Sequence, residues 1–444
     1  MRGGMKRLSG NGKRLAVVDL FAGCGGLGLG LHQAGFTSVF VNELNKDAMA
    51  TYLVNRSATE PHLLDREFHC NDIKDLVSDP IRLTRLQAAL RTNFGIGRED
   101  LDLVCGGPPC QGFSGIGHRR SYSVEREQLP SNHLYQDMAY VISRLRPKAF
   151  LFENVRGLFK ARWTGSGPKG EVFASILNAF ASIPGYTVAC DLVFAKDYGV
   201  PQNRPRLLIV GILNDLGRLP PGLTTGQMDA VSRGFLPGPI RRPAPDIQEL
   251  LGDLEDPDYE NGGSTSRYRR RPLTPVQRKL RAQPNGVISG RGDPVTEQEY
   301  SMHTERVRRK FSAMLASSDG SIPEEYRTKK FAQRVLPRRW GADGPNITAA
   351  SLPDDYVHFS QPRSLTVREW ARLQMFPDWY QFEGKRTTGG LRRAGNPREG
   401  IFDRELPKYT QIGNAVPVTL AFHLGLHLRS LITGRTSQAS HTIQ

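Results

Sequence analysis

The sequence contains few cysteines, and none of them has the spacing of a zinc-binding pair. Five cysteines are scattered over 444 residues, and no Cys-x-x-Cys pair occurs among Cys24, Cys70, Cys105, Cys110 and Cys190. An odd number of dispersed cysteines argues against a disulfide framework, and the missing pair argues against structural zinc. We therefore expect reduced thiols and no bound metal.

Long hydrophobic runs are also absent. We find no run of about 18 apolar residues, the length that a membrane span requires. Residues 1–12 are polar and rich in glycine, without the apolar core of a signal peptide. A hydrophobic content of 38% is typical of a soluble globular protein. We expect a cytoplasmic protein that makes no membrane contact.

Acidic residues are outnumbered by basic ones, and the excess is concentrated in one region. The net charge is +16, and residues 261–340 hold 18 Lys and Arg against 7 Asp and Glu. Excess positive charge attracts polyanions, and aromatic side chains interleave with this charge. We expect nucleic acid to contact this region, for example at Arg269, Arg270 and Arg271. A solvated charged face is the alternative.

The most distinctive stretch of the chain follows the apolar run 101–105. It reads Gly-Gly-Pro-Pro-Cys-Gln-Gly-Phe-Ser over residues 106–114. A buried strand that ends in a rigid loop places the loop where open α/β sheets keep their active sites. The loop presents Cys110, whose thiolate would be a nucleophile. A buried structural cysteine beside a tight turn is the alternative.

A glycine-rich turn near the N-terminus predicts a nucleotide-like ligand. Residues 15–21 have the pattern of a buried strand, and Gly23, Gly25 and Gly28 then satisfy G-x-G-x-x-G. The next strand, 39–42, ends at Glu43, where a carboxylate can accept hydrogen bonds from ribose hydroxyls. On these residues alone, a nicotinamide or flavin site remains a rival.

Strand and helix patterns alternate from residue 15 to residue 213, which predicts a doubly wound α/β sheet. Further strands are expected at 68–73, 149–152, 187–195 and 207–213. The regular pattern fades beyond residue 211 and returns with an amphipathic helix at 366–376. We expect a catalytic and cofactor-binding domain at 1–212, a small domain with the target-recognition region at 213–405, and a returning segment at 406–444.

With these pieces in order over nearly the whole chain, the sequence resembles the DNA (cytosine-5) methyltransferases of bacterial restriction-modification systems. The resemblance implies a Rossmann-like, S-adenosylmethionine-dependent methyltransferase sheet with a smaller, irregular DNA-recognition domain. The motifs that match the family's cofactor site contain Phe21 against adenine, Glu43 on the ribose, and the pair Asp72 and Ile73 at the adenine. The cofactor site also includes Gly23, Gly25, Gly26, Pro109, Asn414 and Val416.

The resemblance also assigns the catalytic residues. Cys110 matches the nucleophile, Glu153 the acid, and Gln202-x-Arg204-x-Arg206 the arginine motif beside a flipped base. Cytosine C5 is a poor nucleophile, so a thiolate must first add at C6 while an acid offsets the charge that develops at N3. One departure is Pro205, which stiffens the motif without removing either arginine.

The resemblance implies double-stranded DNA as the substrate. Gln111 and Ser114, in the loop of the nucleophile, would contact the DNA, and so would Arg119 and Arg120, on a loop at 115–130 that either closes over DNA or is merely solvated. A Gly- and Arg-rich stretch at 384–410 is a further candidate contact. We expect a monomer and a cognate restriction endonuclease as a functional partner. A cytosine-5 methyltransferase acting on RNA is the runner-up, and a non-enzymatic DNA-binding module is the third reading.

Overall fold

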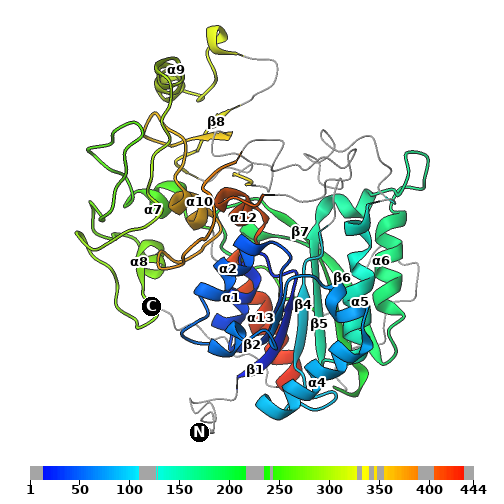
Figure 1. Ribbon diagram of the computed structural model, residues 1–444. Helices are drawn as coiled ribbons and strands as arrows, with labels where there is room; N and C mark the ends of the chain where they lie inside the picture. Colours follow the sequence, from blue (N-terminus) through cyan, green and yellow to red (C-terminus); the bar gives the residue numbers. More distant parts are fainter. Residues whose placement is uncertain are drawn as a thin grey trace.

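The computed structural model of this chain (Figure 1) describes most of the two regions expected above. The residues described are 14–109, 127, 129–216, 235–240, 244–327, 333–339, 345–347, 355–388 and 405–434.

The larger part of the molecule is built on a seven-stranded sheet with the order β3-β2-β1-β4-β5-β7-β6. The strands are β1 Leu15–Leu20, β2 Phe36–Asn42, β3 His69–Cys70, β4 Leu103–Gly106, β5 Ala149–Val155, β6 Tyr186–Phe194 and β7 Pro205–Leu213. Neighbours from β3 to β5 pair in parallel, whereas β7 runs antiparallel to both β5 and β6. The parallel strands therefore end together at one edge of the sheet.

Helices cover both faces of this sheet. The helices of this part are α1 Gly26–Gln33, α2 Lys46–Val54, α3 Lys74–Val77, α4 Pro80–Phe94, α5 Leu134–Leu145, α6 Glu171–Ala181, α12 Lys408–Asn414 and α13 Val418–Thr433. Successive residues of β1 show the two layers: Val17 belongs to the core beneath α1 and α13, and Val18 to the core beneath α4, α5 and α6. Alternation of side chains across a strand explains this division.

The C-terminal helices return to the sheet and pack closely on α1. A Cβ atom at Gly30 would lie 2.4 Å from Cβ of Ala421 and 2.5 Å from the carbonyl oxygen of Val418. The helical segment Lys408–Thr433 is long and apolar enough to span a membrane by length and composition, and 56% of its most apolar window is buried in the structure. Its apolar side chains belong to the core shared with α1 and the sheet.

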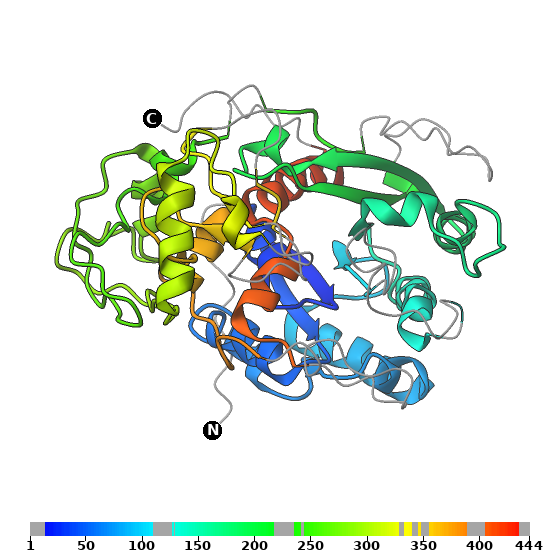
Figure 2. The same cartoon turned by 90° about the horizontal axis from the view of Figure 1, so that it is seen from above.

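The second region lies beside the sheet and is mostly irregular; seen from above, it occupies the side opposite α5 and α6 (Figure 2). Its elements are α7 Ile247–Leu251, α8 Pro275–Arg281, α9 Glu305–Ala316, α10 Val367–Leu373, β8 Arg334–Val335 and β9 Tyr356–Val357. Six short 3-10 helices complete the described elements: Pro61–Leu64, Pro130–His133, Arg156–Lys160, Ala195–Tyr198, Asn214–Leu216 and Glu324–Tyr326.

The doubly wound α/β fold predicted from the sequence is confirmed. The direction of β7 was not predicted, and the expected strand at 68–73 is reduced to the two residues of β3. The expected division at 212/213 and 405/406 stays a prediction.

Candidate active site at the carboxyl ends of the strands

The glycine-rich turn after β1 has a backbone that only small residues adopt easily. Gly23 and Gly25 have positive φ of 56° and 86°, and Gly25 caps the start of α1. A Cβ at Gly23 would meet nothing within 4 Å, so the turn faces open space there. From below, the hydroxyl of Tyr380 donates a hydrogen bond to the carbonyl of Cys24 at 2.7 Å. The turn is therefore fixed on one side and accessible on the other.

Phe21 and Glu43 stand at the ends of neighbouring strands beside this turn. Phe21 is half-buried and has a φ of 53°, unusual for an aromatic residue. Glu43 accepts hydrogen bonds from the backbone N–H groups of Gly23 and Asn45, both at 2.8 Å. Burial raises the pKa of Glu43, and these two bonds oppose that shift. The carboxyl group is thus held in place, as a ribose-binding acid must be.

Asn42 joins the strand ends and was not predicted from the sequence. Its Oδ1 accepts a hydrogen bond from the N–H of Phe21 at 3.4 Å, and its Nδ2 donates to the carbonyl oxygen of Asn71 at 2.8 Å. Next along the chain, Asp72 is exposed and Ile73 is buried. Asn42 therefore fixes the turn that carries Asp72 relative to Phe21. A buried asparagine directly before Glu43 was the only sequence signal for it.

The turn that follows α12, at residues 415–417, contacts the glycine-rich turn after β1, which we call the cofactor turn. A Cβ at Gly26 would lie only 2.4 Å from the carbonyl oxygen of Val416. Val416 is buried and Asn414 is exposed, so the turn presents the latter side chain outward. Residues that are far apart in sequence, Gly26 and Val416, are thus brought together at the expected cofactor site.

The predicted acid and one predicted arginine meet on neighbouring strands. The register of β5 and β7 places Val155 opposite Arg206, and Arg206 forms an ion pair with Glu153 in which both side chains are largely buried. Burial lowers the pKa of Arg206, whereas the carboxylate of Glu153 acts in the opposite direction. The structure therefore groups an acid and a guanidinium at one end of β5.

The loop after β4 approaches this acid. A Cβ at Gly107 would lie 2.8 Å from Oε2 of Glu153, so a larger residue there would displace the carboxyl group of Glu153. Asn154 Nδ2 donates a hydrogen bond to the carbonyl of Pro108 at 3.0 Å, and Pro109 is exposed. Asn154 is a second residue whose positioning role was not predicted individually. Cys110 itself lies outside the described residues, directly after this anchored segment.

The two predicted arginines have different surroundings. Arg204 does not join the pair of Arg206 with Glu153; it is 2% exposed and donates hydrogen bonds to backbone carbonyls of segments 345–347 and 413–415. Burial lowers the pKa of Arg204 well below its ordinary value, and the positive charge of Arg206 adds to that effect. The structure brings Arg204 to the junction of several segments.

Of the predicted DNA contacts, Gln111, Ser114, Arg119 and Arg120 lie outside the described residues. Arg269, Arg270 and Arg271 are exposed. Arg269 pairs with Asp256 at 3.4 Å, and Arg270 pairs with Glu255 at 2.8 Å. Nearby acids thus offset part of the positive charge that the sequence concentrates here, whereas Arg271 forms no such ion pair with the described residues.

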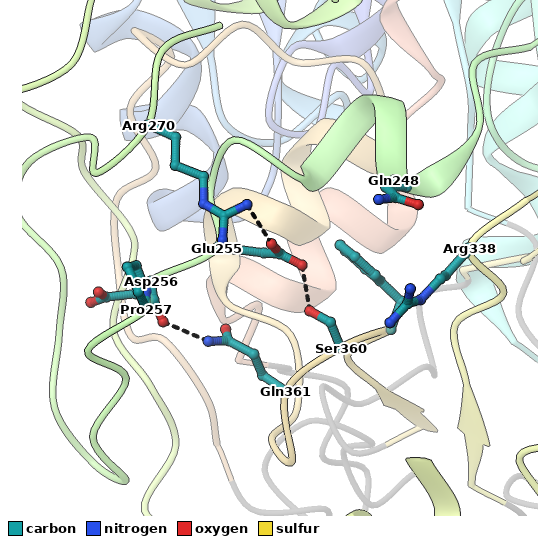
Figure 3. A pocket seen from close by; sticks show the side chains of 9 residues that line it. Gln248, Glu255, Asp256, Pro257, Arg270, Arg338, Ser360 and Gln361 are labelled. Carbon is teal, nitrogen blue, oxygen red and sulfur yellow. Dashed lines mark hydrogen bonds and ion pairs between the residues drawn. The ribbon is translucent and has the colours of Figure 1, made fainter. Parts of the chain in front are cut away.

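A pocket of about 370 Å³ lies beside this arginine cluster (Figure 3). All of its lining residues come from positions 248–361 of the second region. Two hydrogen bonds connect residues that line the pocket. Ser360 donates to the carboxylate of Glu255 at 2.5 Å, and Gln361 donates to the carbonyl oxygen of Asp256 at 2.6 Å. The carboxylate of Glu255 at its centre makes this pocket unsuited to a phosphate group. Within the described ranges, no cluster of His, Cys, Asp and Glu could hold a metal ion.

The sheet order, the antiparallel β7 and the glycine turn beside Glu43 define a Rossmann-like methyltransferase. The sequence profile described as C-5 cytosine-specific DNA methylase matches residues 15–430, and the chain belongs to this family. It is therefore a DNA (cytosine-5) methyltransferase that uses S-adenosylmethionine. The family acts on DNA, and its cofactor is S-adenosylmethionine and not a nicotinamide or a flavin.

Individual relatives agree with the family assignment. The chain is 28% identical to the Type II methyltransferase M.DdeI of Desulfomicrobium norvegicum, over 91% of this chain and 86% of that protein. It is 29% identical to M.XorII of Xanthomonas oryzae pv. oryzae, over 96% of this chain and 87% of that protein. A DNA modification methyltransferase from an E. coli prophage superposes with a TM-score of 0.62 at 24% identity, covering 94% of this chain and 99% of that one, which supports the fold.

The described residues fit this cofactor. The open space at Gly23 suits a part of the cofactor that lies close to the protein backbone. The fixed carboxyl group of Glu43 suits a ribose, and the half-buried ring of Phe21 suits an adenine. The individual residues assigned to the cofactor, the reaction and DNA stay predictions.

Proposed function

We propose that this enzyme methylates carbon 5 of a cytosine flipped out of a specific double-stranded DNA sequence, through a covalent bond between Cys110 and C6. The observation that carries the proposal is the pairing of Glu153 with Arg206 beside the anchored segment that leads to Cys110. Binding alone would need neither group. A base stacked in a duplex cannot reach these atoms, so the target base must leave the helix.

The chain's own residues would divide the work as follows. The thiolate of Cys110 adds to C6, and the electron pair displaced from the C5–C6 bond moves into the ring toward N3. Glu153 donates a proton at N3, and Arg206 offsets charge on the ring and on the acid. When bound, S-adenosylmethionine would supply the methyl group that C5 takes up, with S-adenosylhomocysteine as the leaving group, and N3 returns its proton to Glu153. Loss of the C5 proton to a base then re-forms the double bond and expels the thiolate.

The other cysteines support Cys110 as the nucleophile. The thiolate is the reactive form, and burial raises the pKa of a thiol. Burial raises the pKa of the four described thiols, Cys24, Cys70, Cys105 and Cys190. At neutral pH these four would be poor nucleophiles.

The second region would recognise the sequence of the duplex. We propose a catalytic and cofactor-binding domain at 1–212, a small domain with the target-recognition region at 213–405 and a returning segment at 406–444. We extend to this chain the Type II designation of M.DdeI and M.XorII, so a restriction endonuclease acting on the same site would be its functional partner. One nucleophile and one cofactor turn suffice for a monomer. We place the enzyme in the cytoplasm, with the DNA.

Trapping with 5-fluorocytosine tests the mechanism. Base-resolution mapping of 5-methylcytosine in DNA from expressing cells first gives the target sequence. A duplex with fluorine at C5 of that cytosine blocks the last proton loss, so wild-type protein with S-adenosylmethionine should form a complex that survives denaturing electrophoresis.

The matched variants separate the roles in this assay. Cys110→Ala should form no complex, and Glu153→Gln should bind the cofactor normally but form the complex at least about 100-fold more slowly, since a general acid contributes about 10²–10⁴-fold. Wild-type protein that binds cofactor and methylates DNA without forming a complex would refute the covalent step.

A further inference from the structure

Two side chains at the start of β7 connect the recognition region to the catalytic strand end. Gln202 is fully buried, and its Oε1 accepts a hydrogen bond from the N–H of Ile347 at 3.1 Å. Its Nε2 donates to the carbonyl oxygen of Leu373 at 2.5 Å and to Oε1 of Gln374 at 3.0 Å. Gln202 therefore contacts both the segment 345–347 and the end of α10.

Arg204 makes a parallel set of contacts. Its Nη1 donates to the carbonyl of Ile347, and its Nη2 donates to the carbonyls of Gly413 at 2.6 Å and Ala415 at 3.2 Å. These two carbonyls lie at the C-terminal end of α12, where the partial negative charge of a helix favours a cation. The Nε of Arg204 has no hydrogen-bond partner among the described residues, so its two Nη groups make the contacts that join both segments, which the single nitrogen of a lysine could not do.

Gln374 closes the arrangement, which we call the clasp, consisting of Gln202, Arg204 and Gln374. The Nε2 of Gln374 donates to the carbonyls of Ile412 at 2.8 Å and Ala415 at 3.2 Å. The clasp therefore links four chain segments: the start of β7, the segment 345–347, the end of α10 and the turn after α12.

Each linked segment leads to a different part of the proposed site. Arg206, which pairs with Glu153, lies on β7, two residues beyond Arg204, which directly precedes that strand. The turn after α12 continues to Val416, whose carbonyl packs on Gly26 of the cofactor turn. In the sequence, the segment 345–347 lies between the basic residues of 261–340 and α10. A shift of that segment would reach the acid and the cofactor turn through the clasp.

We propose that Gln202 and Arg204 are positioning residues that couple recognition of the DNA sequence to the rate of catalysis. This inference rests on the proposed function. Arg204 acts through Arg206 and the turn after α12, without touching the base. Binding of the correct DNA sequence would fix the position of the segment 345–347. Through the clasp, that segment would hold Arg206 and Glu153 in their reactive positions.

The test compares Arg204→Lys and Gln202→Leu with wild-type protein in single-turnover methyl transfer. Two duplexes are used: the mapped target, and the same duplex with one base pair of the target replaced. We expect both variants to transfer methyl to the target about tenfold or more slowly, the range of an ordinary coupling between sites. Transfer to the altered duplex should change little, so the ratio of the two rates should fall by a similar factor.

Matched controls remove the effect of lost stability. Arg368 is also fully buried and also donates to backbone carbonyls, those of Pro377 at 3.2 Å and Tyr380 at 2.9 Å, outside the clasp. Gln298 is a buried glutamine that donates to the carbonyl oxygen of Leu254 at 3.2 Å. Arg368→Lys and Gln298→Leu should lower the melting temperature comparably while leaving the ratio of rates unchanged.

Each result decides one claim. A ratio in Arg204→Lys and Gln202→Leu equal to that of the control variants would overturn the coupling, because a purely structural role slows both duplexes alike. If wild-type protein transferred no methyl group to any duplex, the proposed function would fail first, and the inference would fail with it.

Discussion

Adding one methyl group at Gly26 should damage the cofactor site, and the structure sets the size of the effect. The Cβ atom of Gly26→Ala would lie 2.4 Å from the carbonyl oxygen of Val416, whereas ordinary contacts begin near 3.4 Å. The glycine turn or the turn after α12 must therefore retreat by about 1 Å. The oxygen belongs to the backbone, so no side-chain rotation can relieve the contact.

Two effects of this substitution oppose each other. Alanine favours a helix over glycine by at most about 1 kcal/mol, and Gly26 is only the first residue of α1. Overpacking in a close-packed interior costs about 1–3 kcal/mol. We expect the clash to prevail. If the glycine turn is the part that moves, the cost appears as weaker cofactor binding, at roughly tenfold in Kd for each 1.4 kcal/mol.

Calorimetric titration with S-adenosylhomocysteine and thermal unfolding would measure the two quantities. Gly165→Ala is the control for the substitution itself, because a Cβ there meets nothing within 4 Å. Gly30→Ala creates a clash of the same size one turn further along α1, so it should lower stability with a smaller loss of affinity. Gly26→Ala that binds as tightly as Gly165→Ala would refute the close contact.

Two further predictions follow from charge. Burial and the nearby Arg363 lower the pKa of His358 to about 3, although Glu369 acts against this. His358 is thus neutral in the fold and protonated on unfolding, so stability should fall as pH decreases from about 6.5 toward 3, and His358→Gln should reduce that slope by about one proton in denaturant titrations. Arg271→Ala should lower the slope of log affinity for DNA against log salt by about 0.9, the value for one phosphate contact, and Arg269→Ala by less, since Asp256 already pairs with Arg269. Equal slopes for the two variants would contradict this.

The strands and the residues at their ends could be predicted because their signals are local. The buried runs, the glycine turn and the carboxylates Glu43 and Glu153 each follow from a few neighbouring residues. The antiparallel direction of β7 could not be predicted in this way, because an apolar strand has the same pattern in either direction. The two residues of β3 likewise reflect pairing with β2, which a single-strand pattern does not contain.

The positioning residues could not be predicted because their partners are distant in the chain. Tyr380 supports the carbonyl of Cys24 from a segment more than 300 residues away, and Asn42 joins three strand ends. The motif also assigned Arg204 and Arg206 similar roles, since both are arginines of the same short motif. Only the fold shows that Arg206 meets Glu153 while Arg204 meets backbone carbonyls.

The second region is held by buried ion pairs, and this explains how an irregular segment can keep a fixed geometry. Arg372 on α10 lies between two buried carboxylates, bonding to Asp253 at 2.5 Å and to Asp378 at 2.6 Å, and Arg281 on α8 shares Asp253. Such pairs add little net stability, but removing one partner leaves an unpaired buried charge and costs about 3–5 kcal/mol. A different arrangement of the loops would incur the same cost. The ion pairs therefore hold these loops on α10, and Gln374, at the end of α10, joins that arrangement to Gln202 and to the carbonyl oxygens of Ile412 and Ala415.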